Sequence, residues 1–149
     1  MIIRKLRETD FDQVLAMMLP FYASEALLIH PSEAVLRRTL QDALSDTPYL
    51  EGYGFEEDGA LVGYSLFAKS YSTEAGGLCI WIEDIYIRPE FRGRGFGTAL
   101  LEFAARSYEG KAVRIRLEAE PDNEKAIEVY KRSGFETLGY LQLVKEMTL

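Results

Sequence analysis

The 149-residue sequence is poor in the residues that build disulfides and metal sites. Its one cysteine, Cys79, cannot form an internal disulfide, so nothing in the sequence points to an oxidising compartment. Because it has one histidine, His30, and no Cys/His set at metal-ligand spacing, we expect no metal. No run approaches the roughly 18 to 20 apolar residues of a membrane span, and Arg4 brings charge too early for a signal peptide. These absences predict a cytoplasmic protein that does not enter membranes.

Basic residues are also scarce relative to acidic ones. The sequence has 17 Lys and Arg against 24 Asp and Glu, a formal net charge of −7. Nucleic acids and anionic membrane surfaces require a basic face, so neither is expected as a partner, although a local basic site remains open. We expect one domain, residues 1–149, because no repeat, low-complexity tract or Pro/Ser-rich linker divides the chain.

Apolar periodicity predicts a mixed α/β order of elements. We expect Pro20 to end the first helix, Ser32 to cap the second, and Asp58-Gly59 to form a hairpin turn. The predicted strands are 2–5, 49–57, 60–70, 78–87 and 112–118, with one or two closing strands within 135–145. The predicted helices begin at Thr9 or Asp10 and at about Ser32, and then span 98–108 and 123–132.

A glycine-rich turn follows the predicted central strand 78–87. In the stretch Arg92-Gly93-Arg94-Gly95-Phe96-Gly97, three alternate glycines let the backbone curl until successive N–H groups point at one spot. Such a nest before a helix binds anions, and the two arginines add positive charge. The turn fits neither the dinucleotide fingerprint G-x-G-x-x-G nor the Walker loop with its Gly-Lys-Ser/Thr. It therefore predicts another kind of phosphate site, with a solvated turn as the alternative.

Three blocks of the sequence resemble the GNAT superfamily of N-acetyltransferases. Residues 92–98 are similar to its Q/R-x-x-G-x-G/A signature, residues 85–91 to the strand and turn before it, and residues 123–135 to its N-x-x-A-x-x-x-Y-x-x-x-G-F segment. The resemblance implies an α/β fold with a mixed, mostly antiparallel sheet of six or seven strands and about four helices. It also implies acetyl-CoA as cosubstrate, no metal, and a homodimer.

The same resemblance implies where acetyl-CoA binds. Backbone amides of the glycine turn would hold its pyrophosphate, and the preceding strand would line its pantetheine and thioester. The residues concerned are Arg92, Gly93, Arg94, Gly95, Phe96, Gly97 and Thr98 in the turn, and Ile85, Tyr86 and Ile87 in the strand. Asn123 would contact the pantetheine arm, although a helix N-cap is its simpler explanation.

Two carboxylates, Glu83 and Asp84, interrupt the otherwise apolar central strand. Buried charges are costly unless they are paired or used, and adjacent side chains face opposite sides of a sheet unless a bulge intervenes. One explanation is an ion pair with Arg114 or Arg116; the other is a base that takes a proton from an attacking amine. Residues 81–87 are similar to the strand of the spermidine/spermine acetyltransferase branch, and that resemblance selects Glu83 as the base.

Tyr130 lies on the apolar side of the last predicted helix. A core tyrosine would explain it, whereas the family resemblance gives it the role of the acid that protonates the departing thiolate. In this family the linker between the first two helices borders the acceptor pocket. Tyr22, Glu25 and His30 in that region, together with Asp84, are therefore candidates for contact with the substrate.

The function implied is transfer of acetyl from acetyl-CoA to a primary amine, by direct attack in a ternary complex. The acidic balance favours a small cationic acceptor that is polyamine-like or aminoglycoside-like. Acetylation of a protein N-terminus or lysine, and a non-catalytic acyl-CoA-binding domain, are the alternatives.

Overall fold

A computed structural model describes residues 1–25 and 27–147 of the chain. Its centre is a five-stranded sheet whose strands lie side by side in chain order. They are β1 (Ile2–Lys5), β2 (Leu50–Glu57), β3 (Ala60–Ser72), β4 (Gly77–Ile87) and β5 (Arg114–Leu117). Strands β1 to β4 pair in antiparallel fashion, and β5 pairs in parallel with β4. The sheet is therefore mixed and mostly antiparallel, as the sequence predicted.

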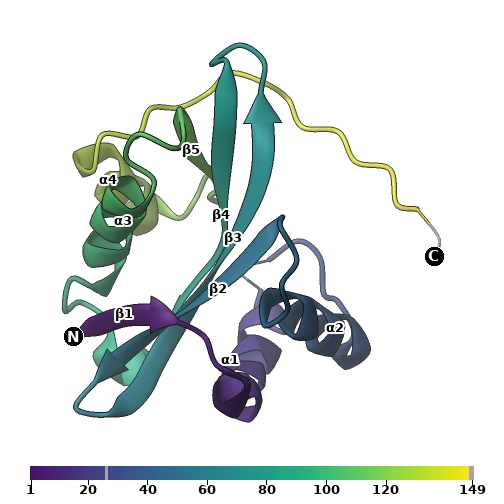
Figure 1. Cartoon of the computed structure of the whole chain (residues 1–149), viewed down its shortest axis with the longest axis vertical. Helices are drawn as coiled ribbons and strands as arrows, with labels where there is room; N and C mark the ends of the chain where they lie inside the picture. Colours follow the sequence, from purple (N-terminus) through teal and green to yellow (C-terminus); the bar gives the residue numbers. More distant parts are fainter. Residues whose placement is uncertain (26, 148–149) are drawn as a thin grey trace.

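Helices cover both faces of the sheet. They are α1 (Phe11–Tyr22), α2 (Glu33–Ala43), α3 (Phe96–Ser107) and α4 (Glu124–Arg132), with short 3-10 turns η1 (Glu8–Asp10) and η2 (Pro89–Phe91). Helices α1 and α2 lie on one face, and α3 and α4 lie on the other (Figure 1). Each face has its own apolar core, one built under α1 and α2 and one under α3. Because both faces of β4 are covered, its long apolar run is explained.

Several local signals in the sequence act as expected. Ser32 caps α2, because its hydroxyl accepts a hydrogen bond from the backbone N–H of Val35 at 3.4 Å. Asp58 and Gly59 have φ angles of 50° and 78°, the left-handed pair that a tight hairpin between β2 and β3 requires. Within the described part of the chain, no helix is both long and apolar enough to cross a membrane.

The expected end of the first helix at Pro20 is wrong, since α1 continues to Tyr22. Proline removes one donor near the end of the helix, but the backbone N–H of Ala23 still reaches the carbonyl of Leu19 at 3.1 Å. Packing of Phe21 and Tyr22 against the apolar core under α1 favours this extra half turn. Helix α3 likewise begins at Phe96, two residues before the expected position 98, because Gly95 serves as its N-cap.

The expected closing strands within 135–145 are wrong for the structure described. Residues 136–147 form no strand there, and the sheet has five strands instead of six or seven. A strand exists only against a hydrogen-bonded neighbour, and an apolar sequence does not supply that neighbour by itself. The segment instead runs away from the body of the molecule in an extended course (Figure 1).

Candidate active site

A β-bulge in β4 positions the two carboxylates of the central strand. In the register with β3, Leu66 pairs with Asp84 and Phe67 pairs with Ile82, so Glu83 is an extra residue without a partner. Ile82 and Ile85 both pack into the core under α3. The two residues between them therefore share the opposite face, the one covered by α1 and α2. Without the bulge, the carboxylates would lie on opposite sides of the sheet.

Asp84 is enclosed by tyrosine hydroxyls. Its side chain is almost fully buried, with the residue 3% exposed. The hydroxyl of Tyr22 donates to its Oδ1 at 2.5 Å, and the hydroxyl of Tyr64 donates to its Oδ2 at 3.0 Å. Burial raises the pKa of the Asp84 carboxyl, while the two donated hydrogen bonds oppose that rise. Both carboxylate oxygens are thus occupied by protein groups.

The alternative in which an arginine of β5 neutralises Asp84 is wrong. The guanidinium of Arg114 instead pairs with Glu74, with its NH1 nitrogen 2.6 Å from Oε1. That of Arg116 lies over the ring of Trp81, 4.7 Å from the ring centroid. Sequence reasoning also missed Tyr64. The signal that finds Tyr64 is the register of β3 against β4, which places it two residues from the partner of Asp84 on the same face.

Glu83 differs from its neighbour because its carboxylate keeps access to solvent. Among the described residues it makes no hydrogen bond or ion pair to another side chain. Partial burial raises the pKa of the Glu83 carboxyl, and the negative charges of Asp84 and Glu118 raise it further. A carboxylate with a raised pKa and no partner has its lone pairs available to accept a proton from a bound molecule.

Strands β4 and β5 part beside these carboxylates. Their pairing ends at Ile82 and Leu117, while β4 continues to Ile87. The backbone N–H of Arg88 donates to the carbonyl of Val62 at 2.9 Å, and hydrogen-bonded pairs in an antiparallel ladder recur at every second residue. The N–H and C=O groups of Ile85 and Ile87 therefore point away from β3, toward the edge that β5 has left.

The glycine turn follows at the end of this open edge. Gly93 and Gly95 have φ angles of 75° and 83°, a left-handed conformation that other residues rarely adopt. Gly95 is the N-cap of α3 and brings no side chain to the first N–H groups of the helix, which have no intrahelical acceptor. A Cβ added at Gly93, Gly95 or Gly97 would meet no atom within 4 Å. Unpaired donors therefore border open space, which is the environment that an anion requires.

The arginines of the turn are held by the protein. Nε of Arg92 donates to the carbonyl of Ile87 at 2.9 Å. NH1 of Arg94 lies 3.2 Å from Oε2 of Glu57, and the guanidinium of Arg94 also covers the ring of Phe91 at 4.9 Å. Both arginine side chains remain exposed. They add positive charge at the turn in fixed positions, although Glu57 offsets part of that of Arg94.

Helix α4 supplies Asn123 and Tyr130. Asn123 is its N-cap, because Oδ1 accepts from the N–H of Ala126 at 3.4 Å. Tyr130 is half-buried and, like Ile85 and Leu117, packs against the core under α3. Burial raises the pKa of its hydroxyl. Within the described residues that hydroxyl makes no hydrogen bond, so its proton is free for a bound molecule.

The residues expected near the acceptor are only partly brought together. Tyr22, at the end of α1, donates a hydrogen bond to Asp84. Burial raises the pKa of its hydroxyl, and the charges of Asp84 and Glu83 raise it further. Nδ1 of His30 lies 2.7 Å from the backbone carbonyl of Tyr22, so His30 contacts the last residue of α1 through its backbone. Glu25 is exposed, and its carboxylate makes no hydrogen bond or ion pair with the other described residues. Tyr22 is thus the one of these three that reaches the carboxylate pair.

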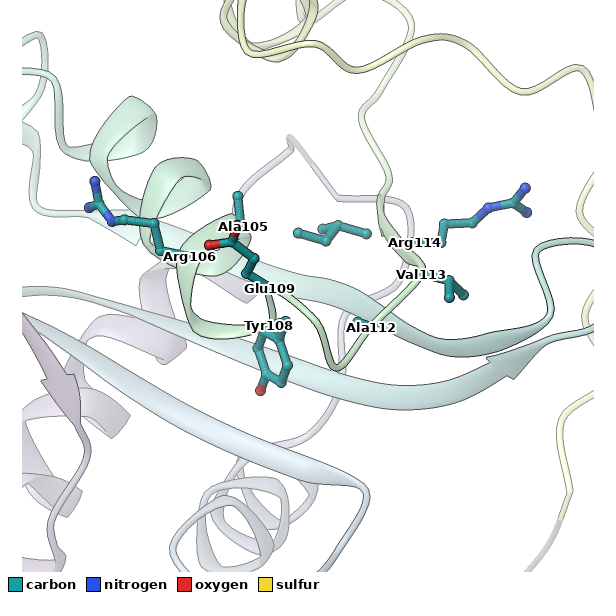
Figure 2. A pocket seen from close by; sticks show the side chains of 8 residues that line it. Ala105, Arg106, Tyr108, Glu109, Ala112, Val113 and Arg114 are labelled. Carbon is teal, nitrogen blue, oxygen red and sulfur yellow. The ribbon is translucent and has the colours of Figure 1, made fainter.

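An open cavity lies elsewhere in the molecule. It has a volume of about 470 Å³ and is formed by the C-terminal end of α3 and the start of β5, the opposite end of α3 from the glycine turn. Its lining includes Ala105, Tyr108 and Val113, with Arg106 and Arg114 at its margin (Figure 2). No group of three or more metal-ligating side chains occurs anywhere in residues 1–25 and 27–147.

This α/β architecture and motif order match a known class of enzymes. The acetyltransferase (GNAT) family profile matches residues 13–135. Thialysine N-epsilon-acetyltransferase of Bos taurus is 31% identical over 148 residues, which cover 92% of this chain and 85% of that protein. Spermine/spermidine N(1)-acetyltransferase of Bacillus subtilis (strain 168) is 28% identical over 116 residues, 74% of each chain. The crystal structure of aminoglycoside N-acetyltransferase AAC(6')-Iy in complex with CoA superposes with a TM-score of 0.79 at 18% identity, covering 99% of this chain and 95% of that one.

The chain therefore belongs to the acetyltransferase (GNAT) family. The family resemblance drawn from the three sequence blocks is confirmed, and so is the expected fold class apart from its strand count. Membership supports an acetyl-CoA-dependent N-acetyltransferase.

Proposed function

We propose that this enzyme transfers acetyl from acetyl-CoA to the primary amine of a small cationic molecule, by direct attack in a ternary complex, and that it acts as a homodimer. The observation that carries the proposal is the bulge at Glu83. It places an unpaired carboxylate with a raised pKa at the point where β4 loses its partner strand and its backbone becomes available. The proposed base and the free backbone edge that would bind the pantetheine arm thus lie next to each other on β4.

The residues around the open edge fit acetyl-CoA. The pyrophosphate would accept hydrogen bonds from the backbone amides of the turn 92–98, where the glycines leave room for close approach. The pantetheine arm would lie along β4 and pair with the outward backbone groups of Ile85 and the outward N–H of Ile87, whose carbonyl already accepts from Arg92. Tyr86, between them, faces the other core. Asn123 would contact the arm while still capping α4. This arrangement orients the thioester beside Glu83, and orientation supplies much of the rate in such transfers.

Glu83 would act as the base and Tyr130 as the acid. The Glu83 carboxylate takes a proton from the attacking ammonium or amine, directly or through one water, and its raised pKa brings it closer to the working pH. The amine nitrogen bonds to the acetyl carbon as the carbon–sulfur bond breaks. The phenol of Tyr130 has no protein acceptor and a raised pKa, so it carries a proton to deliver to the departing thiolate.

The acceptor side of the site is acidic. Glu83, Asp84 and Glu118 are close enough for the charges of the latter two to raise the pKa of the first, and no cation among the described residues pairs with Glu83. A cationic amine would relieve this repulsion. The B. subtilis relative is named for polyamines and the bovine relative for thialysine, both of which are amines. Tyr22, fixed by Asp84, would form one wall of the acceptor pocket, with Glu25 and His30 at its mouth.

Isothermal calorimetry with acetyl-CoA, followed by detection of free thiol with a panel of amines, tests the proposal. We expect micromolar acetyl-CoA affinity and thiol release that depends on polyamines, thialysine-like amines or aminoglycosides. Failure to bind acetyl-CoA would end the proposal. Release with peptides alone would replace the acceptor by a protein N-terminus or lysine, and binding without release would indicate a non-catalytic domain.

A further inference from the structure

Arg116 places a positive charge on the same face of the sheet as Glu83. On β5, its neighbours Ile115 and Leu117 both pack into the core under α3. Because side chains alternate along a strand, Arg116 points to the opposite face, where the bulge also places Glu83. The acceptor side of the proposed site lies on this face, so Arg116 belongs to its surroundings.

An aromatic ring holds the guanidinium of Arg116. This group lies over the ring of Trp81, 4.7 Å from the ring centroid, and Trp81 is the partner of Arg116 in the register of β4 with β5. A cation over an aromatic face is attracted to the ring without giving up its N–H donors to an acceptor. Trp81 therefore fixes the position of the charge and does not neutralise it.

No carboxylate of residues 1–25 and 27–147 forms an ion pair with Arg116. Oε1 of Glu74 instead accepts a hydrogen bond from NH1 of Arg114 at 2.6 Å. Glu118 follows Arg116 by two residues, and its Oε1 accepts from Nε2 of Gln142 at 2.6 Å. The side chain of Arg116 is only partly exposed and donates no hydrogen bond to another described residue. Its donors and its charge are thus available to an anionic group of a bound molecule.

The separation between Arg116 and Glu83 sets the kind of molecule that could contact both. Trp81, which lies under the guanidinium, precedes Glu83 by two positions on β4, a separation of about 7 Å along an extended strand. In a basic amino acid, about six bonds join the side-chain nitrogen to the carboxyl carbon, and they span roughly 7 Å when extended. A single small molecule can therefore place an amine beside Glu83 and a carboxylate beside Arg116.

We propose that Arg116 determines the choice of acceptor by binding its carboxylate, so that the preferred acceptors are amines that also carry a carboxylate, as basic amino acids do. The inference rests on the proposed function, in which the amine reacts beside Glu83. An amino acid with two ammonium groups and one carboxylate keeps a net positive charge and stays within the small cationic class. A diamine without a carboxylate would bring its second ammonium toward Arg116, and like charges repel.

Matched pairs of acceptors test this role in the purified full chain. L-lysine and cadaverine differ only by the carboxylate, as do L-ornithine and putrescine. With detection of free thiol, kcat/KM should be about 10- to 100-fold higher for at least one amino acid than for its diamine, the gain expected from a charged hydrogen-bonded pair. Arg116→Gln should remove most of this preference by raising KM for the amino acid, while the diamine is used equally well or better.

Two further variants separate recognition of the acceptor from folding. Arg116→Lys keeps the positive charge, so it should retain part of the preference that Arg116→Gln loses. Arg106→Gln, at an exposed position on α3, lowers the net charge by the same single unit and should leave the use of both acceptors unchanged. Calorimetry should give the same acetyl-CoA affinity for all three variants as for the wild type.

Three results would overturn the inference. If neither amino acid is used better than its diamine while other amines release thiol, Arg116 does not select the acceptor, and the proposed function stands. If Arg116→Gln lowers activity equally with both members of a pair and also lowers the melting temperature, Arg116 only stabilises the pairing of β4 with β5. If no amine releases thiol from acetyl-CoA, the proposed function itself fails, and the inference fails with it.

Discussion

Replacement of Glu83 by glutamine tests the catalytic proposal most directly. Glu83→Gln keeps the size of the side chain and its place in the bulge but removes the carboxylate that we propose accepts the proton. A positioned general base contributes about 100- to 10,000-fold to rate. At about 1.4 kcal/mol per factor of ten, the variant should raise the activation free energy by about 3 to 5 kcal/mol. Because Glu83 donates nothing to the glycine turn, acetyl-CoA binding should remain nearly unchanged.

The neighbouring Glu118 provides the matched control. Its negative charge is one of the causes that raise the pKa of Glu83. Glu118→Gln should therefore lower that pKa, and the fall of kcat/KM on the acid side should move to lower pH, because the base works in its ionised form. The glutamine side chain can still accept the hydrogen bond from Gln142. Turnover at high pH should change only a few-fold.

Steady-state kinetics from acid to alkaline pH, with calorimetry for acetyl-CoA, test whether Glu83 is the base. The reasoning is refuted if Glu83→Gln keeps full activity across the pH range. It is refuted equally if Glu118→Gln loses as much turnover as Glu83→Gln, because the catalytic carboxylate would then be that of Glu118, just after β5, and not that in the bulge.

Three further outcomes follow from the structure. Tyr130→Phe should lower kcat without weakening acetyl-CoA binding or lowering the melting temperature, since the hydroxyl has no protein partner to lose; a marked loss of stability would contradict this. Gly95→Ala should destabilise the protein by about 1 kcal/mol through its φ of 83°, and calorimetry should show weaker acetyl-CoA binding, with Gly95→Glu abolishing it. Asp10→Asn should cost about 2 kcal/mol in urea unfolding, because Arg4 donates to both carboxylate oxygens at 2.7 and 3.0 Å. Arg4 holds the pKa of Asp10 below its ordinary 3.8, so this contribution should be present above that pH and be lost as the pH falls further.

Much of the fold could be predicted because its signals are local. A capping serine, an Asp-Gly turn and apolar periodicity each act over a few residues, and the structure contains all three where they were expected. The glycine turn is equally local, and it precedes a helix as predicted. The prediction of closing strands within 135–145 is wrong because strand formation depends on segments that are distant in sequence. Their apolar residues 138–144 need a neighbouring strand, and no local pattern says whether that neighbour belongs to the same chain or to another.

Only part of the candidate site could be predicted, because some of its contacts join residues that are distant in sequence. Glu83 could be found as a charge within an apolar strand, but the partners of Asp84 could not, since Tyr22 and Tyr64 come from elements 62 and 20 residues away in sequence. The arginines of β5 were plausible by strand adjacency, yet they face Glu74 and Trp81. Side-chain partners across elements depend on strand register, and register depends here on a bulge that the sequence does not mark.

That bulge explains why two adjacent carboxylates can serve different purposes. The bulge places Glu83 and Asp84 on the same face of the sheet, so their two negative charges lie close together. In a strand with regular alternation, the two charges would lie on opposite faces. Tyrosine donors hold Asp84 in place, whereas Glu83 keeps its lone pairs free. The repulsion between them raises the proton affinity of the unpaired member. A fixed, hydrogen-bonded carboxylate thus tunes its neighbour, and removal of the Asp84 charge should lower the pKa of Glu83 and weaken it as the proposed base.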